Sequence, residues 1–508
     1  MIAPPEISPA VLAPIGFTAI GAMVILVLDA LLSRGRSLLG RRITPAYAGT
    51  LLALTAMVFL WLALYVAVVA YADGDSEVFQ LANPVYQQDR LGSFATALLI
   101  VVGILTCALS VSYLSELGIH HGAYYALILA SITGGIFLVG SVDLLGVYVG
   151  LELMTLPVYV LAGFDRRRLR SNEAAIKYFV TGSFATAILL YGLALTYGAT
   201  GSTSFAAIRD AFDPAHPISL LGLGLTLAGF AFKIASVPFH QWAPDVYEGA
   251  PVPVTAFMSI VVKAAAFVAL LRLVATAVGP ATEQLSGVFA VLAVLSMIVG
   301  SVMAIIQENV KRMLAYSSIG HAGALLVGLA TGTPQGYGAV VFYLAVYAFM
   351  NLGAFGVVVA IARRGRECEK LAEFAGLART RPGLAAAMTL FMLSLAGIPG
   401  TAGFMAKFNL VVAAVRADMI WLPITIVVTS VVSLFYCLRI PVLMTMREPS
   451  GQPSRTAIAS GEALVLCVCA VVVLFLGFFP NHGMLPRVVF ELSVLDWAND
   501  SVRALFGP

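Results

Sequence analysis

The chain has 508 residues, of which 60% are apolar and only 11% are charged. Soluble domains carry about 25% charged residues, so this composition excludes a soluble enzyme, a disordered protein and a nucleic-acid-binding protein. Because a membrane-spanning helix needs about 20 apolar residues, the chain has room for roughly a dozen spans. The apolar runs are continuous rather than alternating, which excludes a transmembrane β-barrel.

Apolar runs between polar breaks predict an all-α polytopic membrane protein with about fourteen spans. The polar loop 72–90 is predicted to form a small hairpin, and the basic loop 363–383 a short surface helix. The predicted spans are 11–33, 47–71, 91–114, 122–140, 143–163, 174–198, 218–237, 253–275, 284–306, 318–332, 336–362, 384–412, 417–442 and 460–480.

Basic loop residues predict the orientation. Most arginines lie in the alternate loops 34–42, 166–170, 311–312, 363–381 and 447–455. By the positive-inside rule these loops are cytoplasmic. Both termini are then expected on the outer, periplasmic side of a cell inner membrane. The opposite loops carry only Arg90, Arg209, Arg416, Arg487 and Arg503.

Lysines are distributed differently from arginines. Of the six lysines, Lys177, Lys233, Lys263 and Lys407 fall inside predicted spans. A buried lysine can release its proton, whereas an arginine cannot. Since a central ionisable residue costs ~2.5–3.5 kcal/mol, we interpret these lysines as proton-carrying or paired groups. Arg272 and Arg439 lie near span ends, where we expect them to extend toward the membrane surface.

Glu152 is the acidic counterpart in the middle of its span. Gly146 and Gly150 precede it and permit close packing of a neighbouring helix, and Asp143 is interpreted as the start of the same helix. A functional carboxylate is favoured over a purely structural charge pair. For Lys177 an ordinary surface ion pair is the alternative, because Glu173 lies four residues before it.

Two predicted spans contain proline and glycine breaks close to a lysine. One break follows Lys233 at Pro238, and the other, at Pro399 and Gly400, precedes Lys407. Discontinuous helices in corresponding positions of two halves indicate an ion pathway. Spans 4–8 and 9–13 are therefore predicted to form inverted five-helix repeats with broken helices 7 and 12. Ordinary proline kinks are the alternative.

The predicted repeats divide the chain into four parts. Residues 1–121 hold the first three spans, and 122–275 hold the first five-helix repeat. Residues 276–442 hold the second repeat, and 443–508 hold the last span and the tail.

Two histidines and the five cysteines are the remaining candidates for acid–base or metal-binding chemistry. His321 near a helix start is either a structural residue or a proton relay. His240 in the first broken segment is a candidate for proton entry, and the nearby Asp245 and Glu248 either attract protons or are simply solvated. No C-x-x-C pair occurs, so we expect no metal site and small buried cysteines.

Together these motifs resemble the antiporter-like membrane subunits of respiratory complex I. The matching segments are 150–157, 233–251, 311–321 and 397–407. The resemblance covers spans 4–13, and the combination is much more specific than any one segment. It implies a proton-translocating subunit of an NADH:quinone oxidoreductase, driven by redox chemistry in other subunits.

The resemblance also implies roles for individual residues. Glu152 and Lys233 would form the charge pair of a first half-channel. Lys263 would be the connecting lysine, and Lys407 the terminal lysine of the second half-channel. Lys177 and His321 match family positions as well, His321 in the central hydrophilic axis.

Cofactors and partners follow from the same resemblance. NADH, FMN, iron–sulfur clusters and quinone (ubiquinone among them) belong to other subunits of the family, so this chain is expected to hold no cofactor. The implied partners are the lipid bilayer and other membrane-arm subunits, including the neighbouring antiporter-like subunit M and small subunits. Subunit M typically has glutamate where this chain has Lys407, and subunit L is longer.

Alternatives remain open at this point. A subunit of a multisubunit sodium/proton antiporter would share the same lysines and fold, as would the membrane arm of an energy-converting hydrogenase. A structural spacer without transport is disfavoured because the charges within the spans are costly. A solute transporter is disfavoured because the polar groups are single and spaced.

Overall fold

The computed structural model describes residues 9–34, 37–38, 41–42, 45–74, 77–80, 84–362, 367–448, 458–479, 493–503 and 505. The chain forms two compact units. Unit 1 consists of Met1–Lys233, Val261–Ala281 and Ala504–Pro508, and unit 2 consists of Ile234–Ile260 and Thr282–Arg503. This division cuts across the four-part division drawn from the repeats, which stays a prediction.

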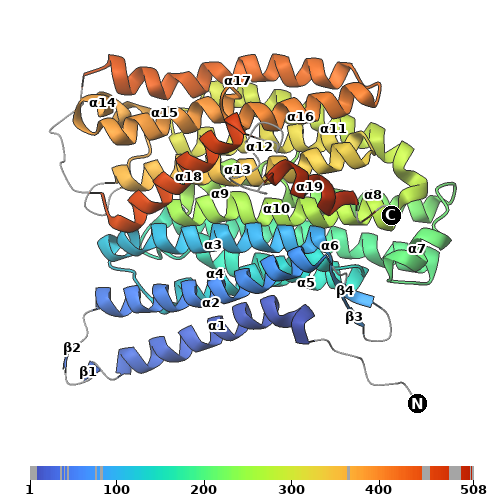
Figure 1. The fold of residues 1–508 in the computed structure, drawn as a ribbon, viewed down its shortest axis with the longest axis horizontal. Coiled ribbons are helices and arrows are strands. Elements are labelled where there is room, and N and C mark those ends of the chain that lie inside the picture. The colour runs from blue at the N-terminus through green and yellow to red at the C-terminus, as the bar shows by residue number, and fades with distance from the viewer. Residues whose placement is uncertain are drawn as a thin grey trace. The chain divides into compact units, whose positions relative to one another are not determined.

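Unit 1 begins with four long apolar helices that pack side by side, drawn in blue to cyan in Figure 1. A small hairpin precedes the third helix, as predicted for the loop 72–90. In it Val78 pairs with Gln87, and Phe79 with Tyr86. The elements are α1 (Pro9–Arg34), β1 (Ser37–Leu38), β2 (Arg41–Arg42), α2 (Pro45–Asp73), β3 (Glu77–Gln80), β4 (Pro84–Gln88), α3 (Arg90–Leu117) and α4 (Gly122–Gly140).

The rest of unit 1 carries the glutamate predicted to be functional. Asp143 caps the helix that contains it: its Oδ1 accepts from the backbone N of Leu145 at 2.8 Å, which confirms the predicted helix start. Gly150 packs against the backbone of Leu138 in α4, so the glycine does allow close packing. The elements are α5 (Leu144–Ala162), α6 (Leu169–Thr200), α7 (Phe205–Ala211), α8 (Pro217–Lys233) and residues 261–276 of α10 (Val252–Thr276).

Unit 2 is built around α13, which is almost entirely buried and contacts five other helices of the unit. Two short helices lie in the basic loop after it, where one was predicted. The short helix η1 (Gly279–Ala281) belongs to unit 1. The elements of unit 2 are α9 (Trp242–Gly249), α11 (Thr282–Ile305), α12 (Val310–Ala330), α13 (Pro334–Ile361), η2 (Leu371–Phe374), α14 (Leu377–Thr380), α15 (Pro382–Ala396), α16 (Ala402–Arg416), α17 (Trp421–Met446), α18 (Ser460–Phe478) and α19 (Val494–Arg503).

The predicted class, an all-α membrane protein, is confirmed. Among the described residues, 12 helices are long and apolar enough to cross a membrane. The other two predicted spans correspond to α8 and to the α15–α16 pair, whose helices are shorter. Both predicted breaks are full interruptions rather than kinks, since the chain leaves the helix at 234–241 and at 397–401. The inverted relation between the repeats stays a prediction.

One helix begins earlier than predicted. The span expected at 318 starts at Val310, because the Asn309 side chain accepts from the backbone N of Lys311 and Arg312 at 2.9 and 3.2 Å. The assignment of Lys311 to a loop was therefore wrong. Lys311 is fully buried, and its Nζ donates to Ala250 O at 2.6 Å and Glu367 Oε2 at 3.3 Å. The carbonyl and the carboxylate beside Lys311 Nζ make this burial tolerable.

The prediction that Arg272 extends to the membrane surface was also wrong. Its side chain is 1% exposed and forms two 2.7 Å hydrogen bonds with the carboxylate of Asp89, the residue that caps α3. Its Nε donates to Val139 O at 3.0 Å. Arg439 is partly exposed, and its Nη1 donates to Gln307 O at 3.1 Å beyond the end of α11. Both guanidiniums bond protein oxygens, but only Arg272 is buried.

Some residues considered in the sequence lie outside the described part of the chain, namely Arg36, Arg363, Arg364, Arg366, Arg455 and Arg487. Four of the cysteines are buried, as expected, whereas Cys467 is exposed on α18.

Candidate functional site

In unit 1, the end of α8 lies beside α5 and α6. Glycines allow this approach: a side chain on Gly192 of α6 or Gly222 of α8 would collide with the opposite helix. Close contact of α6 and α8 brings the last residue of α8, Lys233, to the middle of α6. This lysine is 2% exposed.

Glu152 and Lys233 are joined by one hydroxyl group. Thr186 Oγ1 donates to Glu152 Oε1 at 2.8 Å and accepts from Lys233 Nζ at 3.1 Å. Lys233 Nζ also donates to Tyr159 OH at 3.2 Å. Among the described residues no direct ion pair connects Glu152 and Lys233. The two groups predicted to form a charge pair are thus linked through a neutral side chain that can both donate and accept.

The remaining lysines of unit 1 differ in their surroundings. Lys263 lies within α10 and is 2% exposed. Lys177 is about half exposed, and its Nζ lies 2.7 Å from Glu173 Oε1 one turn away. The surface ion pair left open by the sequence is therefore present on α6.

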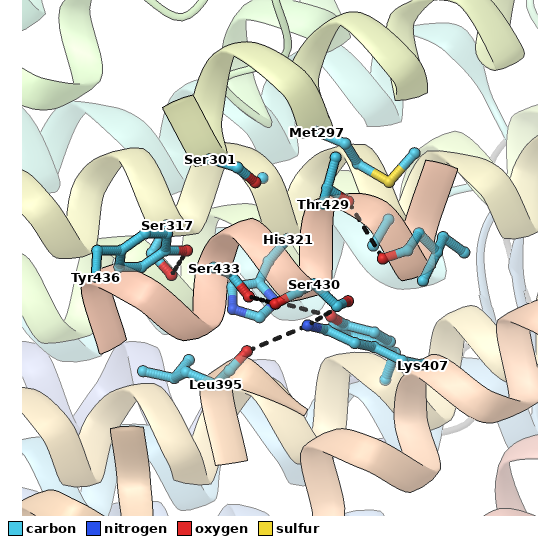
Figure 2. A pocket seen from close by; sticks show the side chains of 14 residues that line it. Met297, Ser301, Ser317, His321, Leu395, Lys407, Thr429, Ser430, Ser433 and Tyr436 are labelled. Atoms are coloured by element: carbon cyan, nitrogen blue, oxygen red, sulfur yellow. Dashed lines mark hydrogen bonds between the residues drawn. The ribbon is translucent and has the colours of Figure 1, made fainter. Parts of the chain in front are cut away.

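In unit 2, Lys407 donates hydrogen bonds to carbonyl groups at the end of α15, the first half of a broken helix. α15 stops at Gly397, whose φ of 87° favours glycine, and α16 begins at Ala402. Lys407 Nζ donates to Ala396 O at 2.9 Å and to Ser430 Oγ at 3.0 Å, with Leu395 O at 3.4 Å (Figure 2). The last carbonyls of α15 thus accept hydrogen bonds from the Lys407 side chain. The helix dipole also favours a positive charge at this end of the helix.

A small cavity joins Lys407 to His321. Its volume is about 20 Å³, room for roughly one water molecule. Figure 2 shows both side chains at this cavity, together with hydroxyl groups from α12 and α17. His321 Nδ1 shares a 2.7 Å hydrogen bond with Tyr343 OH. The polar lining residues are Ser301, Ser317, His321, Tyr343, Lys407, Thr429, Ser430, Ser433 and Tyr436.

The first broken segment is anchored to α12. Arg312 Nη1 lies 2.7 Å from Asp245 Oδ1 and 3.0 Å from Glu248 Oε2. Both carboxylates are paired with Arg312 and are not simply solvated, and a role in attracting protons stays a prediction. His240 lies in the same segment and is partly exposed.

Sequence reasoning missed the hydroxyl groups and one lysine. Thr186, Tyr159 and Ser430 contact the predicted charges directly. Threonine, serine and tyrosine are common in apolar spans, so no pattern in the sequence distinguishes these three. Lys311 could have been found only by extending the predicted helix back to Asn309, a good capping residue.

Comparison with known proteins decides the family. Residues 141–433 match the family described as NADH:quinone oxidoreductase/Mrp antiporter, TM. The chain belongs to this family. The matched region contains Glu152, Lys233, Lys263, His321 and Lys407.

Relatives within this antiporter-like family are named NADH-quinone oxidoreductase subunit N. The protein of that name from Trichlorobacter lovleyi is 44% identical over 397 residues, covering 77% of this chain and 82% of the relative. Subunit N 1 of Herpetosiphon aurantiacus is 38% identical and covers 94% of this chain and 95% of the relative. These names agree with the lysine at position 407, where a glutamate is typical of subunit M.

Solved structures show the same fold. A chain of respiratory complex I from Thermus thermophilus has a TM-score of 0.76 and 33% identity, covering 93% of this chain and 98% of that one. A chain of the Mrp complex from Dietzia sp. has a TM-score of 0.85 at 24% identity, covering 99% and 98%. The second similarity concerns the fold alone.

Proposed function

We propose that this chain is subunit N of an NADH:quinone oxidoreductase and moves protons across a cell inner membrane. The observation that carries the proposal is the linkage of Glu152 to Lys233 through Thr186, in a chain 44% identical to a protein of that name. A half-buried carboxylate, a buried amine and a hydroxyl between them form the minimum set for an electrostatically controlled proton step.

The first half of the relay works through charge. The Glu152 carboxylate stabilises the protonated form of Lys233 in a medium where Coulomb interactions are strong. When the charge of Glu152 is compensated by a neighbouring subunit, Lys233 loses this stabilisation and releases its proton more readily. The two groups then titrate as a coupled pair rather than as independent residues.

The second half of the relay uses Lys263, His321 and Lys407. His321 and Lys407 share a cavity with room for about one water, and a water between polar groups can carry a proton. Lys407 accepts the proton at the end of α15, where the helix dipole stabilises its charge. Lys263 connects the two halves, and Lys177 contributes from the edge of the first.

The energy comes from other subunits. The chain is a subunit of a translocase with no redox centre of its own, so NADH, FMN, iron–sulfur clusters and quinone bind to its partners. Within the membrane, the direct neighbours of this chain are other membrane-arm subunits of the complex, including subunit M and small subunits. The basic loops face the cytoplasm, and both termini face the periplasm.

A second candidate is a subunit of a multisubunit sodium/proton antiporter, or of the membrane arm of an energy-converting hydrogenase. The family description includes Mrp antiporters, and the fold matches a chain of an Mrp complex. A mild-detergent pull-down of the tagged chain separates these candidates. Recovery of an NADH-oxidising flavin and iron–sulfur arm supports complex I, whereas recovery of hydrophobic antiporter subunits alone supports sodium exchange.

Proton transport itself is tested in the reconstituted complex. Glu152→Ala and Lys233→Ala are expected to lower the number of protons pumped per NADH oxidised. Lys370→Ala is the matched control, because Lys370 is exposed and lies outside the spans. Normal pumping per NADH in both site variants would contradict the proposed relay.

A further inference from the structure

A pocket of about 490 Å³ opens at one end of α5, within unit 1. It is bounded by α1, α4 and the loop between α5 and α6. Its size falls in the usual range of small-molecule sites, about 300–1,000 Å³. The lining residues include Asp29, His121, Ala123, Leu127, Val160, Phe164, Arg166 and Arg167.

One end of this pocket is positively charged. Arg166 and Arg167 line it and are exposed, and among the described residues neither guanidinium has an ion-pair partner. The amino end of α4 lies at the same place, with His121 as its cap residue. Asp29 is the one carboxylate of the lining, and its Oδ2 already accepts from Gly122 N at 3.1 Å. The balance of charge and helix dipole favours an anion.

The loop that carries the arginines is held in place. Asp165 is buried, and its Oδ1 accepts from Arg167 N at 3.3 Å. Asn172 Nδ2 donates to Arg166 O at 3.0 Å, and Ser171 Oγ donates to Ala162 O at 2.7 Å. The backbone positions of the two arginines are therefore fixed before any ligand binds, which lowers the entropy cost of binding.

The other end of the pocket is apolar and continues onto the surface of a span. Leu127, Val160 and Phe164 line it. Val160 is also the last residue of an exposed apolar stripe along α5, at helical spacing. The stripe consists of Leu145, Val149, Leu153, Leu156 and Val160, which are 41–58% exposed.

We propose that this pocket binds one anionic phospholipid, with its phosphate against Arg166 and Arg167 and an acyl chain along the stripe on α5. Basic pockets at the ends of membrane helices recognise anionic headgroups. A charged end joined to an apolar surface fits an amphiphile, whereas free phosphate would leave the apolar walls unused.

The test measures lipid bound to the purified full-length chain by native mass spectrometry. Phosphatidylglycerol is compared with phosphatidylcholine at equal concentration. We expect one phosphatidylglycerol bound in preference to phosphatidylcholine. Arg166→Gln with Arg167→Gln should lower this affinity by roughly 30-fold, since each basic residue near an anionic headgroup contributes roughly fivefold. Arg170→Gln is the control, because Arg170 is exposed in the same region but does not line the pocket.

A second variant tests the apolar end without changing charge. Leu127→Trp fills the pocket and should also reduce phosphatidylglycerol binding, with the milder Ala123→Leu as an alternative if the first variant does not fold. Equal binding of both lipids, no loss in the arginine variant, or undiminished binding in both filled variants would overturn the proposal. Displacement of the lipid by equimolar inorganic phosphate would also overturn it. These readouts do not depend on proton pumping.

Discussion

Thr186 places one oxygen atom between Glu152 and Lys233, 2.8 Å from the carboxylate and 3.1 Å from the ammonium nitrogen. The carboxylate therefore acts on the lysine across a hydroxyl group that can rotate. Because hydrogen bonds in a chain polarise one another in a low-dielectric medium, this hydroxyl couples the two charges without neutralising either by direct contact.

Removing the hydroxyl should uncouple the pair. Thr186→Val keeps the shape of the side chain but leaves Glu152 and Lys233 without their shared partner. Hydrogen bonds to charged groups are worth about 1.5–3 kcal/mol, so the coupling between the two charges should weaken by roughly tenfold or more and fewer protons should be pumped per NADH. Thr186→Ser should retain pumping. Thr181→Val on the same helix is the control, since its hydroxyl donates to the backbone O of Lys177 at 2.6 Å. Normal pumping in Thr186→Val would show that the hydroxyl is dispensable.

The turn between α15 and α16 offers a matched pair of glycines. Gly397 and Gly400 have φ of 87° and 86°, so alanine at either position should cost roughly 1–2 kcal/mol of strain. Only at Gly397 would the new methyl group meet Lys407, with its Cδ at 2.9 Å. At Gly400 the nearest atom is a Phe478 ring carbon at 3.6 Å.

Both glycine variants should therefore lose similar stability, as measured by thermal unfolding of the purified chain. Only Gly397→Ala should also reduce proton pumping, because it displaces Lys407 from Ala396 O and Ser430. Equal pumping defects in the two variants would mean that backbone strain, and not the position of Lys407, is responsible.

The buried pair of Arg272 and Asp89 should matter for stability. Breaking such a pair leaves one charge buried without compensation and costs about 3–5 kcal/mol. Arg272→Met should therefore lower the thermal unfolding temperature strongly. The double variant Arg272→Met with Asp89→Asn should recover part of the loss, because the remaining cap is neutral. Arg209→Gln, at an exposed site on α7, should have little effect. No recovery in the double variant would contradict this account.

His120 should make the stability of unit 1 depend on pH. It lies in the loop between α3 and α4, where its ring nitrogens bond Ser115 and Tyr125 at 2.8 Å. Burial, and secondarily the nearby His121, lowers its pKa below the usual 6.5. The unfolded chain then binds a proton more readily than the folded one. The stability that neutral His120 contributes is therefore complete above pH 6.5. It is lost as the pH falls through the lowered pKa of His120 in the folded chain.

Thermal unfolding of the purified chain at pH 7.5 and at pH 5.5 measures this dependence. The unfolding temperature should fall on acidification, and His120→Gln should flatten the fall. His216→Gln, at an exposed histidine, should leave it unchanged. If the unfolding temperature of His120→Gln fell between pH 7.5 and pH 5.5 as much as that of the parent chain, His120 would be ruled out as the source of the pH dependence.

The sequence by itself determined the class of the protein and where its helices run. Continuous apolar runs have only one stable form in a membrane, and proline and glycine next to Lys233 and Lys407 predict breaks that the structure contains. The family followed from the same residues, because costly charges inside spans form a recognisable pattern. Only the tertiary structure decided what those charges contact. Thr186, Ser430 and the inward turn of Arg272 depend on which helices meet, and hydroxyls and span-end arginines carry no periodic signal of their partners.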